Sequence, residues 1–278
     1  MTRKQTYQHV VHTFGPLYNE NSRILILGSI PSHHEDAEKS FEDKKFEEKK
    51  GLELIERKLL DAEEFKRNPY IRNIRIPTIR AGNYILTTAA YEPGETLEYD
   101  MPDFSKDPPE HRYGYFDQRV EFPGIYEGVV PWMSVCPSEI RSMVRHIERA
   151  RGKVLVLGLG LGYYPYMISL KDEVEDITIV EKAPEIIQLF RDHLLPQFEY
   201  KDKVSVIESD AFSYVGALTG GEYDFCFADI WENASDGAWA CRKLRDAEQR
   251  LAGTDFAYWI DDAIMYAHLC ISHRVWTR

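Results

Sequence analysis

Apolar runs of strand length alternate with helical patterns over the second half of the chain. The runs predict strands at 153–157, 177–181, 204–208, 223–229 and 256–261, and the segments between them predict helices at 163–170, 184–194, 211–218 and 237–251. Regular alternation of this kind predicts an α/β fold with a doubly wound, mostly parallel, Rossmann-like sheet that has helices on both faces. Ligands of such sheets bind at the carboxyl ends of the strands.

Three segments of different character precede this pattern. Residues 1–33 contain one apolar run, 23–28, that predicts a strand. Residues 34–69 are dense in charged side chains, with Leu52, Ile55, Leu59 and Leu60 at helical spacing, so we expect an amphipathic helix or a pair of helices. Residues 70–134 predict short strands and turns, that is, a small β-rich segment. A helix over about 137–149 then opens the α/β unit, which we place at 135–278.

The chain is short after the fifth predicted strand. Residues 263–278 leave room for one more helix, at 263–270, but not for two further strands. We therefore expect a sheet that is shortened at its C-terminal end.

Composition narrows the possible partners. The chain has 46 acidic and 34 basic side chains and a net charge of −12, so we do not expect it to bind nucleic acid. It has no apolar run long enough to span a bilayer and no secretory signal pattern at its start, and its four cysteines show no CxxC spacing. We therefore expect reduced thiols, a cytoplasmic location and no membrane partner. The histidines show no metal-ligand spacing, so we predict no metal.

The first strand of the α/β pattern ends in a glycine loop. Gly158, Gly160 and Gly162 form a GxGxG motif that opens a helix. Glycines there allow a tight turn and close approach of a ligand, and N–H groups at a helix start favour an anionic ligand group. The dinucleotide fingerprint would place its third glycine at position 163, where this chain has Tyr163. Taken alone, the loop is equally compatible with a dinucleotide site, another nucleotide site and a structural turn.

Three acidic residues follow the next three strands in order. Glu181 closes the second strand, Asp210 lies just beyond the third, and Asp229 closes the fourth. An acid after the second strand can accept both ribose hydroxyls, a polar group after the third can accept from an adenine amino group, and an acid after the fourth faces the reacting centre. Any one of these acids taken singly is more often a capping or solvated carboxylate, but the ordered set after a glycine loop is more specific than its members.

With these motifs the chain resembles the class I S-adenosylmethionine-dependent methyltransferases over about residues 112–262. The four motifs are VLVLGLGLG at 154–162, ITIVE at 177–181, ESDAF at 208–212 and DFCFADIW at 224–231. The spermidine-synthase-like branch is the most similar, because Val156 stands where the family usually has an acid. The resemblance implies that Gly158, Gly160 and Gly162 pack on the methionine part of S-adenosyl-L-methionine and that Glu181 holds the ribose. It further implies that Asp210 and Ala211 contact adenine and that Asp229 lies beside the methyl group.

The activity implied is transfer of a methyl group to a small-molecule acceptor by in-line displacement. Asp229 or Glu232 would orient a cationic amine or accept its proton. Tyr163 and Trp231 are candidate substrate or cofactor contacts, although ordinary packing explains them equally well. Glu139 is interpreted as a charge that complements a helix N-terminus. We expect the segment 70–134 to fold over the cofactor face.

Two other functions stay open. Aminopropyl transfer is suggested by Val156 and by the Asp229/Glu232 pair, which resembles the DxxD pair of that branch, but Leu161 replaces an acid that helps to place the donor there. A cofactor-binding or interaction protein without catalysis is suggested by the shortened sheet. In addition, residues 12–32 resemble the opening of deoxyinosine-type DNA glycosylases. Because the charged segment follows instead of a base pocket, we interpret this stretch as a fusion remnant or a chance strand and turn.

Overall fold

The computed structural model describes residues 57–106, 109–128, 130–231 and 234–266. The glycosylase-like stretch, the strand predicted at 23–28, most of the charged segment and Glu232 lie outside the described residues. None of the described helices is both long and apolar enough to cross a membrane.

A five-stranded parallel sheet forms the centre of the α/β unit. Its strands are β8 (Gly152–Leu157), β9 (Val174–Glu181), β10 (Val204–Glu208), β11 (Phe225–Ala228) and β12 (Asp255–Tyr258). They lie in the order β10-β9-β8-β11-β12, and each neighbouring pair is parallel. The order reverses between β8 and β11, which is the switch point of a doubly wound, Rossmann-like α/β fold. The predicted fold class is confirmed.

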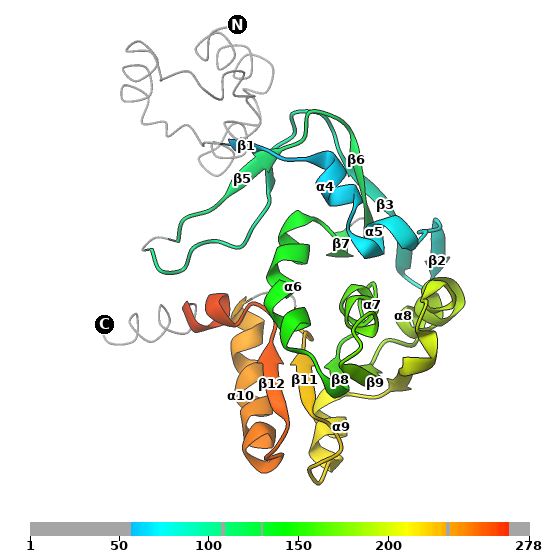
Figure 1. Cartoon of the computed structure of the whole chain (residues 1–278), viewed down its shortest axis with the longest axis vertical. Coiled ribbons are helices and arrows are strands. Elements are labelled where there is room, and N and C mark those ends of the chain that lie inside the picture. Colours follow the sequence, from blue (N-terminus) through cyan, green and yellow to red (C-terminus); the bar gives the residue numbers. More distant parts are fainter. Residues whose placement is uncertain (1–56, 107–108, 129, 232–233, 267–278) are drawn as a thin grey trace, which may run out of the picture.

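Alternating side chains on the strands explain why helices cover both faces (Figure 1). In β8, Val154 and Val156 pack with α6 (Pro137–Arg149), α7 (Tyr163–Ser169) and α8 (Pro184–Leu189), which continues as the π-helix η2 (Phe190–Leu194). Leu155 and Leu157 face the opposite way and pack with α9 (Ala211–Ala217) and α10 (Ala234–Arg250). Two 3₁₀ turns, η3 (Leu195–Gln197) and η4 (Lys201–Lys203), lead into β10.

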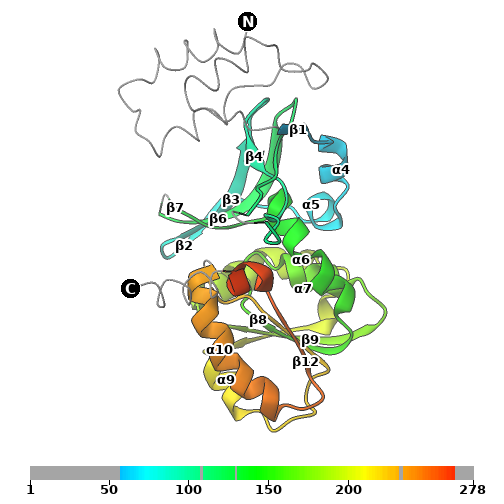
Figure 2. The same ribbon diagram turned by 90° about the vertical axis from the view of Figure 1, so that its left-hand side faces the viewer.

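The predicted β-rich segment is present and forms two further sheets. Strands β2 (Ile79–Ala81), β3 (Tyr84–Tyr91), β6 (Val120–Glu127) and β7 (Val130–Ser134) make an antiparallel sheet in that order. A smaller sheet has the order β1-β5-β4, with β1 at Arg57–Leu59, β4 at Leu97–Glu98 and β5 at Tyr113–Tyr115. Figure 2 shows the antiparallel sheet to one side of the α/β unit, next to α6 and α7.

The helix predicted across Leu59 and Leu60 is wrong at these residues. Arg57–Leu59 form β1, which pairs in parallel with β5, and the N–H of Leu60 donates to the carbonyl of Tyr115 at 2.9 Å. The Arg57 guanidinium also donates to the carbonyl of Gly94 at 2.9 Å. These partners are distant in sequence, so they override the local helical spacing. The helix α4 (Ala62–Lys66) begins only after its N-cap, Asp61.

The predicted C-terminal elements are present with shifted bounds. Strand β12 ends at Tyr258, and residues 261–266 are helical where we expected a helix at 263–270. The rest of that helix lies outside the described residues. Among the described residues the parallel sheet has five strands.

A short helix, α5 (Pro69–Asn73), connects the N-terminal part of the molecule to the glycine loop. Tyr70 is fully buried, and its hydroxyl donates to the carbonyl of Leu161 at 2.5 Å. Its ring lies edge-on to the rings of Tyr163 and Tyr166, with centroids 5.5 and 5.4 Å away. Asn68 and Asn73 donate to the hydroxyls of Tyr163 and Tyr166 at 3.1 and 2.9 Å. The loop therefore rests on α5 as well as on its own sheet.

Replacing Tyr70 with Phe removes the donor to Leu161 and leaves that carbonyl without its partner in a buried place. We expect a loss of about 1–3 kcal/mol in the free energy of unfolding, measured by urea denaturation. The control is Tyr200→Phe, because Tyr200 is 41% exposed. Equal stability of the two variants would contradict the role given to this hydrogen bond.

Candidate functional site

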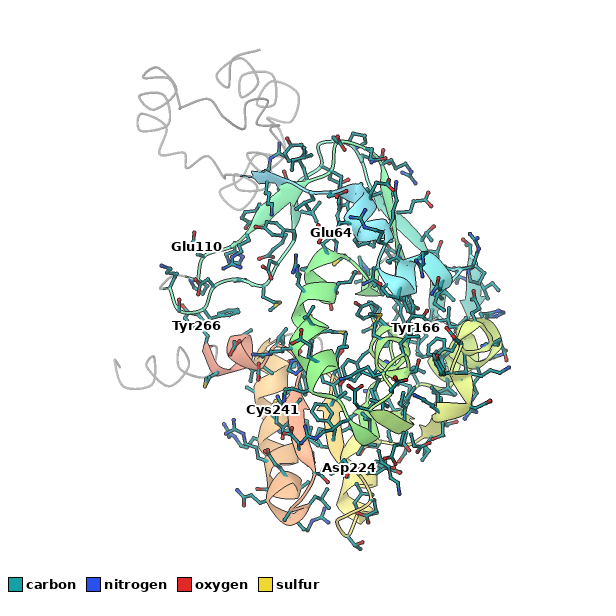
Figure 3. The ribbon with its side chains drawn as sticks, viewed as in Figure 1. Glu64, Glu110, Tyr166, Asp224, Cys241 and Tyr266 are labelled. Carbon is teal, nitrogen blue, oxygen red and sulfur yellow. The ribbon has the colours of Figure 1, made fainter. Side chains whose placement is uncertain are left out.

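A cleft of about 690 Å³ lies at the carboxyl ends of the parallel strands, within the size range of small-molecule and cofactor sites. Residues that follow β8, β9, β10 and β11 line one side, and β3, β6, β7 and the start of α6 line the other. Asp224, labelled in Figure 3, marks the opposite edge of the sheet, where its carboxylate accepts the N–H of Lys153 at 2.8 Å. The β-rich segment thus covers the ligand edge of the sheet.

The structure brings seven of the ten candidate site residues together along this cleft. These are Gly158, Gly160, Glu181, Asp210, Ala211, Asp229 and Trp231. Gly162 and Tyr163 do not line it, and Glu232 lies outside the described residues. Carboxyl ends of neighbouring parallel strands meet at one edge, so residues dispersed over some 70 positions in the chain gather there.

Each glycine of the loop has a reason within the protein to be glycine. All three have positive φ angles, +95° at Gly158, +52° at Gly160 and +71° at Gly162. A Cβ atom at Gly158 would overlap the carbonyl oxygen of Asp229, and one at Gly160 would overlap the sulfur of Met133. A Cβ atom at Gly162 would lie 2.5 Å from the ring of Phe190. The loop is therefore packed against its surroundings whether or not a ligand binds.

The loop's N–H groups are largely used by the protein, contrary to the expectation that they attract an anion. Gly158 donates to the carbonyl of Val180, and Gly162 donates to that of Leu159. Leu159 donates to the Glu181 carboxylate at 3.1 Å. Because these N–H groups already have acceptors within the protein, the loop can pack against a ligand but offers it few free hydrogen-bond donors.

The remaining contact comes from β7. The N–H of Leu161 points at the sulfur of Met133, 3.2 Å away. Met133 thus fills the space above Gly160 and occupies a loop amide at the same time. The β-rich segment and the loop are fitted to each other at this point.

Glu181 is buried, and its carboxylate connects the loop to the start of α8. One oxygen, Oε1, accepts from the N–H groups of Lys182 and Ala183 at 2.8 Å each. The other, Oε2, accepts from Leu159 and retains capacity for a further donor. The carboxylate is therefore held in place at the wall of the cleft.

Asp210 is the N-cap of α9. Its Oδ1 accepts the N–H of Ser213 at 2.8 Å, the capping role that a carboxylate commonly takes at this position. Ala211 follows as the first residue of the helix and is buried at the cleft wall.

The two aromatic candidates have different places. Tyr163 is 5% exposed, packs on Tyr70 and accepts from Asn68, so it is an interface aromatic rather than a cleft residue. Trp231 lines the cleft and is 8% exposed, with its ring against that of Tyr258. Its indole nitrogen has no hydrogen-bond partner among the described residues.

Glu139 is a cleft residue that the sequence pattern does not single out. Glu139 lies in the first turn of α6 and lines the cleft, where it faces Asp229. Both also line a small adjoining cavity of about 20 Å³ behind the glycine loop, large enough for one water molecule. Burial raises the pKa of Glu139 to about 7. Burial, and then the charges of Glu139 and Glu181, raise the pKa of Asp229 well above its usual range.

An aromatic wall from the β-rich segment is the other feature that the sequence analysis missed. Tyr84 and Trp132 pack edge-on with centroids 5.4 Å apart and line the cleft opposite the glycine loop. The segment 70–134 was expected to cover this face, but sequence patterns name no particular side chain in it. Only the strand pairing of β3 with β6 and of β6 with β7 brings these two rings together.

Within the residues described, no group of three or more His, Cys, Asp and Glu side chains is placed to hold a metal ion.

No protein-family model matches the sequence, and no curated protein does. A spermidine synthase from Thermotoga maritima is 14% identical with a TM-score of 0.39, and the match covers 56% of this chain and 59% of that one. A spermidine synthase in complex with the transition-state analogue AdoDATO is 15% identical with a TM-score of 0.40, covering 50% and 54%. The SAH-bound methyltransferase PaMTH1 of Podospora anserina is 22% identical with a TM-score of 0.36, covering 45% and 53%. The chain thus spans little more than half the length of these structures, and likenesses of this size carry no functional argument.

Replacing Gly160 with Ala places a methyl group on the Met133 sulfur and forces an L residue into a positive φ. We expect a loss of about 2–4 kcal/mol in the free energy of unfolding, measured by urea denaturation. The double variant Gly160→Ala/Met133→Ala relieves the overlap, so its loss should be smaller than the sum of the two single losses. Additive losses would show that Met133 does not press on the loop.

Replacing Glu139 with Gln should stabilise the protein increasingly as the pH rises from about 4.5 through 7. Because the folded-state pKa of Glu139 is raised to about 7, the wild type loses stability as pH rises from the unfolded pKa, near 4.5, through 7, and the neutral Gln does not. The melting temperature of the variant should therefore match that of the wild type at pH 4.5 and exceed it by a few degrees at pH 8, at about 2–4 °C per kcal/mol. A difference that is constant over this range would contradict the raised pKa.

Proposed function

We propose that the chain is a methyltransferase that uses S-adenosyl-L-methionine to methylate a small-molecule acceptor. The observation that carries this proposal is the order of groups along one cleft. A glycine loop follows β8, a buried carboxylate closes β9, a capped helix start follows β10 and an acid follows β11. This is the order in which a methionine moiety, a ribose, an adenine and a reacting methyl group would meet the sheet edge.

The residues present fit such a cofactor. Oε2 of Glu181 is fixed by one backbone N–H and can accept from a ribose hydroxyl. The methionine part would lie along the part of the cleft wall that Gly158, Gly160 and Met133 line, and the adenine would lie near Asp210 and Ala211. Five acidic side chains and one lysine, Lys182, line the cleft among the described residues. That balance suits a ligand with a positive charge.

Bound S-adenosylmethionine supplies a methyl group that is already activated by its positively charged sulfur. The protein's own contribution is then to align the acceptor with that methyl group and to exclude water. Tyr84 and Trp132 close the cleft on the side away from the sheet. Asp229 is placed at the switch point, where its carboxyl group can orient the acceptor and accept a proton from it. The acidic lining favours a neutral or cationic acceptor, such as an amine, over an anionic one.

Calorimetric titration with S-adenosylmethionine, S-adenosylhomocysteine and NAD tests this proposal. We expect saturable binding of both adenosyl ligands and none of NAD, with a change in tryptophan fluorescence because Trp132, Trp231 and Trp259 line the cleft. Glu181→Gln should weaken binding about tenfold or more, since it exchanges a carboxylate for an amide at the ribose position. Glu208→Gln, an exposed residue at the end of β10, is the matched control.

Two results would overturn the proposal. Binding of no adenosyl ligand by a folded sample would favour an interaction protein, and selective binding of NAD would make the glycine loop a dinucleotide site. Titration of decarboxylated S-adenosylmethionine in the same series tests aminopropyl transfer. That alternative would require turnover of this donor with putrescine and no methyl transfer.

A further inference from the structure

The small cavity behind the glycine loop is lined by two carboxyl groups that have no partner within the described part of the protein. Neither the Glu139 nor the Asp229 side chain forms a hydrogen bond or an ion pair with a described residue, and both border the same cleft and the same small cavity. Glu181, the third acid at this end, has its carboxylate occupied by three backbone N–H groups. Glu139 and Asp229 are thus the two acids of the small cavity, and no donor from the described residues occupies either of them.

The groups that face this pair carry no compensating positive charge. Asp229 faces Glu139 from α6 and Glu181 from β9. Glu139 also faces the Tyr91 hydroxyl from β3, with Cys136 beside it. Tyr163 and Tyr164 border the small cavity from α7, and Lys182 is an exposed residue of the cleft wall. Two partly buried carboxylates in such surroundings repel each other, so they retain a proton between them until a cation arrives.

We propose that Glu139 and Asp229 form a proton-exchanging pair that distinguishes the cationic donor from its neutral product. This inference rests on the proposed function. The pair, with one proton, carries a charge of −1 in the free protein. Binding of the sulfonium displaces that proton to solvent, and the pair then carries −2 beside a charge of +1.

Methyl transfer reverses the change. The bond from sulfur to the methyl carbon breaks, its electron pair stays on sulfur, and the methyl carbon bonds to the acceptor nitrogen or oxygen. The acceptor loses a proton in the same reaction, and the pair takes it up. The pair thus serves as the base for the reaction. Its charge is again −1, and the thioether sulfur of S-adenosylhomocysteine carries no positive charge for it to attract. The pair therefore favours the exchange of product for a new donor.

The pKa shifts agree with this arrangement. The pKa of Glu139, raised to about 7, and the pKa of Asp229, raised well above its usual range, keep a proton on the pair near neutral pH. A bound sulfonium lowers both pKa values because it stabilises the charged forms.

The test is calorimetric titration of the intact protein at pH 7 in phosphate, imidazole and Tris, whose different ionisation enthalpies reveal protons released on binding. S-adenosylmethionine and S-adenosylhomocysteine share the same amino and carboxyl groups, so the difference between them isolates the sulfonium. We expect release of a large fraction of one proton with S-adenosylmethionine and essentially none with S-adenosylhomocysteine. The affinity for S-adenosylmethionine should accordingly rise severalfold from pH 6 to pH 8, while the affinity for S-adenosylhomocysteine stays constant.

Glu139→Gln should abolish most of this proton release and flatten the pH dependence of donor affinity, while binding of S-adenosylhomocysteine persists. Glu148→Gln, an exposed glutamate on the same helix, is the matched control and should behave as the wild type. Asp229→Asn is a second variant with the same expected effect if Glu139→Gln fails to fold.

The outcomes separate this inference from the function on which it rests. Failure of both adenosyl ligands to bind overturns the proposed function. Binding of both with equal proton release, or unchanged release in a folded Glu139→Gln variant, leaves that function standing and overturns the proton-exchanging pair.

Discussion

The carboxylate of Glu181 is the interaction on which the rest of the site depends. It accepts three backbone N–H groups, one from the glycine loop after β8 and two from the turn that leads into α8. A buried carboxylate needs such donors, and here they connect the glycine loop to the turn before α8 at the carboxyl ends of β8 and β9. The position of Gly158 and Gly160 at the cleft therefore follows from a charge at the end of the neighbouring strand.

The same edge is fixed from outside the parallel sheet. Met133 from β7 fills the space above Gly160, and Tyr70 from α5 donates to the carbonyl of Leu161. Because these contacts come from the β-rich segment and from α5, the N-terminal half of the described structure is part of the site rather than an appendage. It supplies the aromatic wall of Tyr84 and Trp132, and it restricts solvent access to the acids opposite.

The sequence predicted what repeats locally and missed what depends on distant partners. The run Val154–Leu157 could be recognised as a buried strand since both of its faces are apolar, and the acids at strand ends could be aligned because parallel strands end together. The helix predicted at Leu59 was wrong because β5, more than fifty residues away, pairs with that stretch. Glu139 was interpreted as a helix-terminal charge, which it is by position. Its place in the cleft follows only from how α6 packs across β8 and β11, which no local pattern contains.

The charges along the cleft connect the fold to its chemistry. Acids that end or follow β9, β10 and β11, together with Glu139 at the start of α6, concentrate negative charge along the cleft, and the described cleft lining offers one lysine against them. Such a concentration destabilises the empty protein, since carboxylates removed from water raise one another's pKa values. It persists in a folded chain if a cation or a proton offsets it. A site of this kind responds to the charge of its ligand more strongly than to its shape, and a reaction that converts a sulfonium into a thioether changes that charge in a single step.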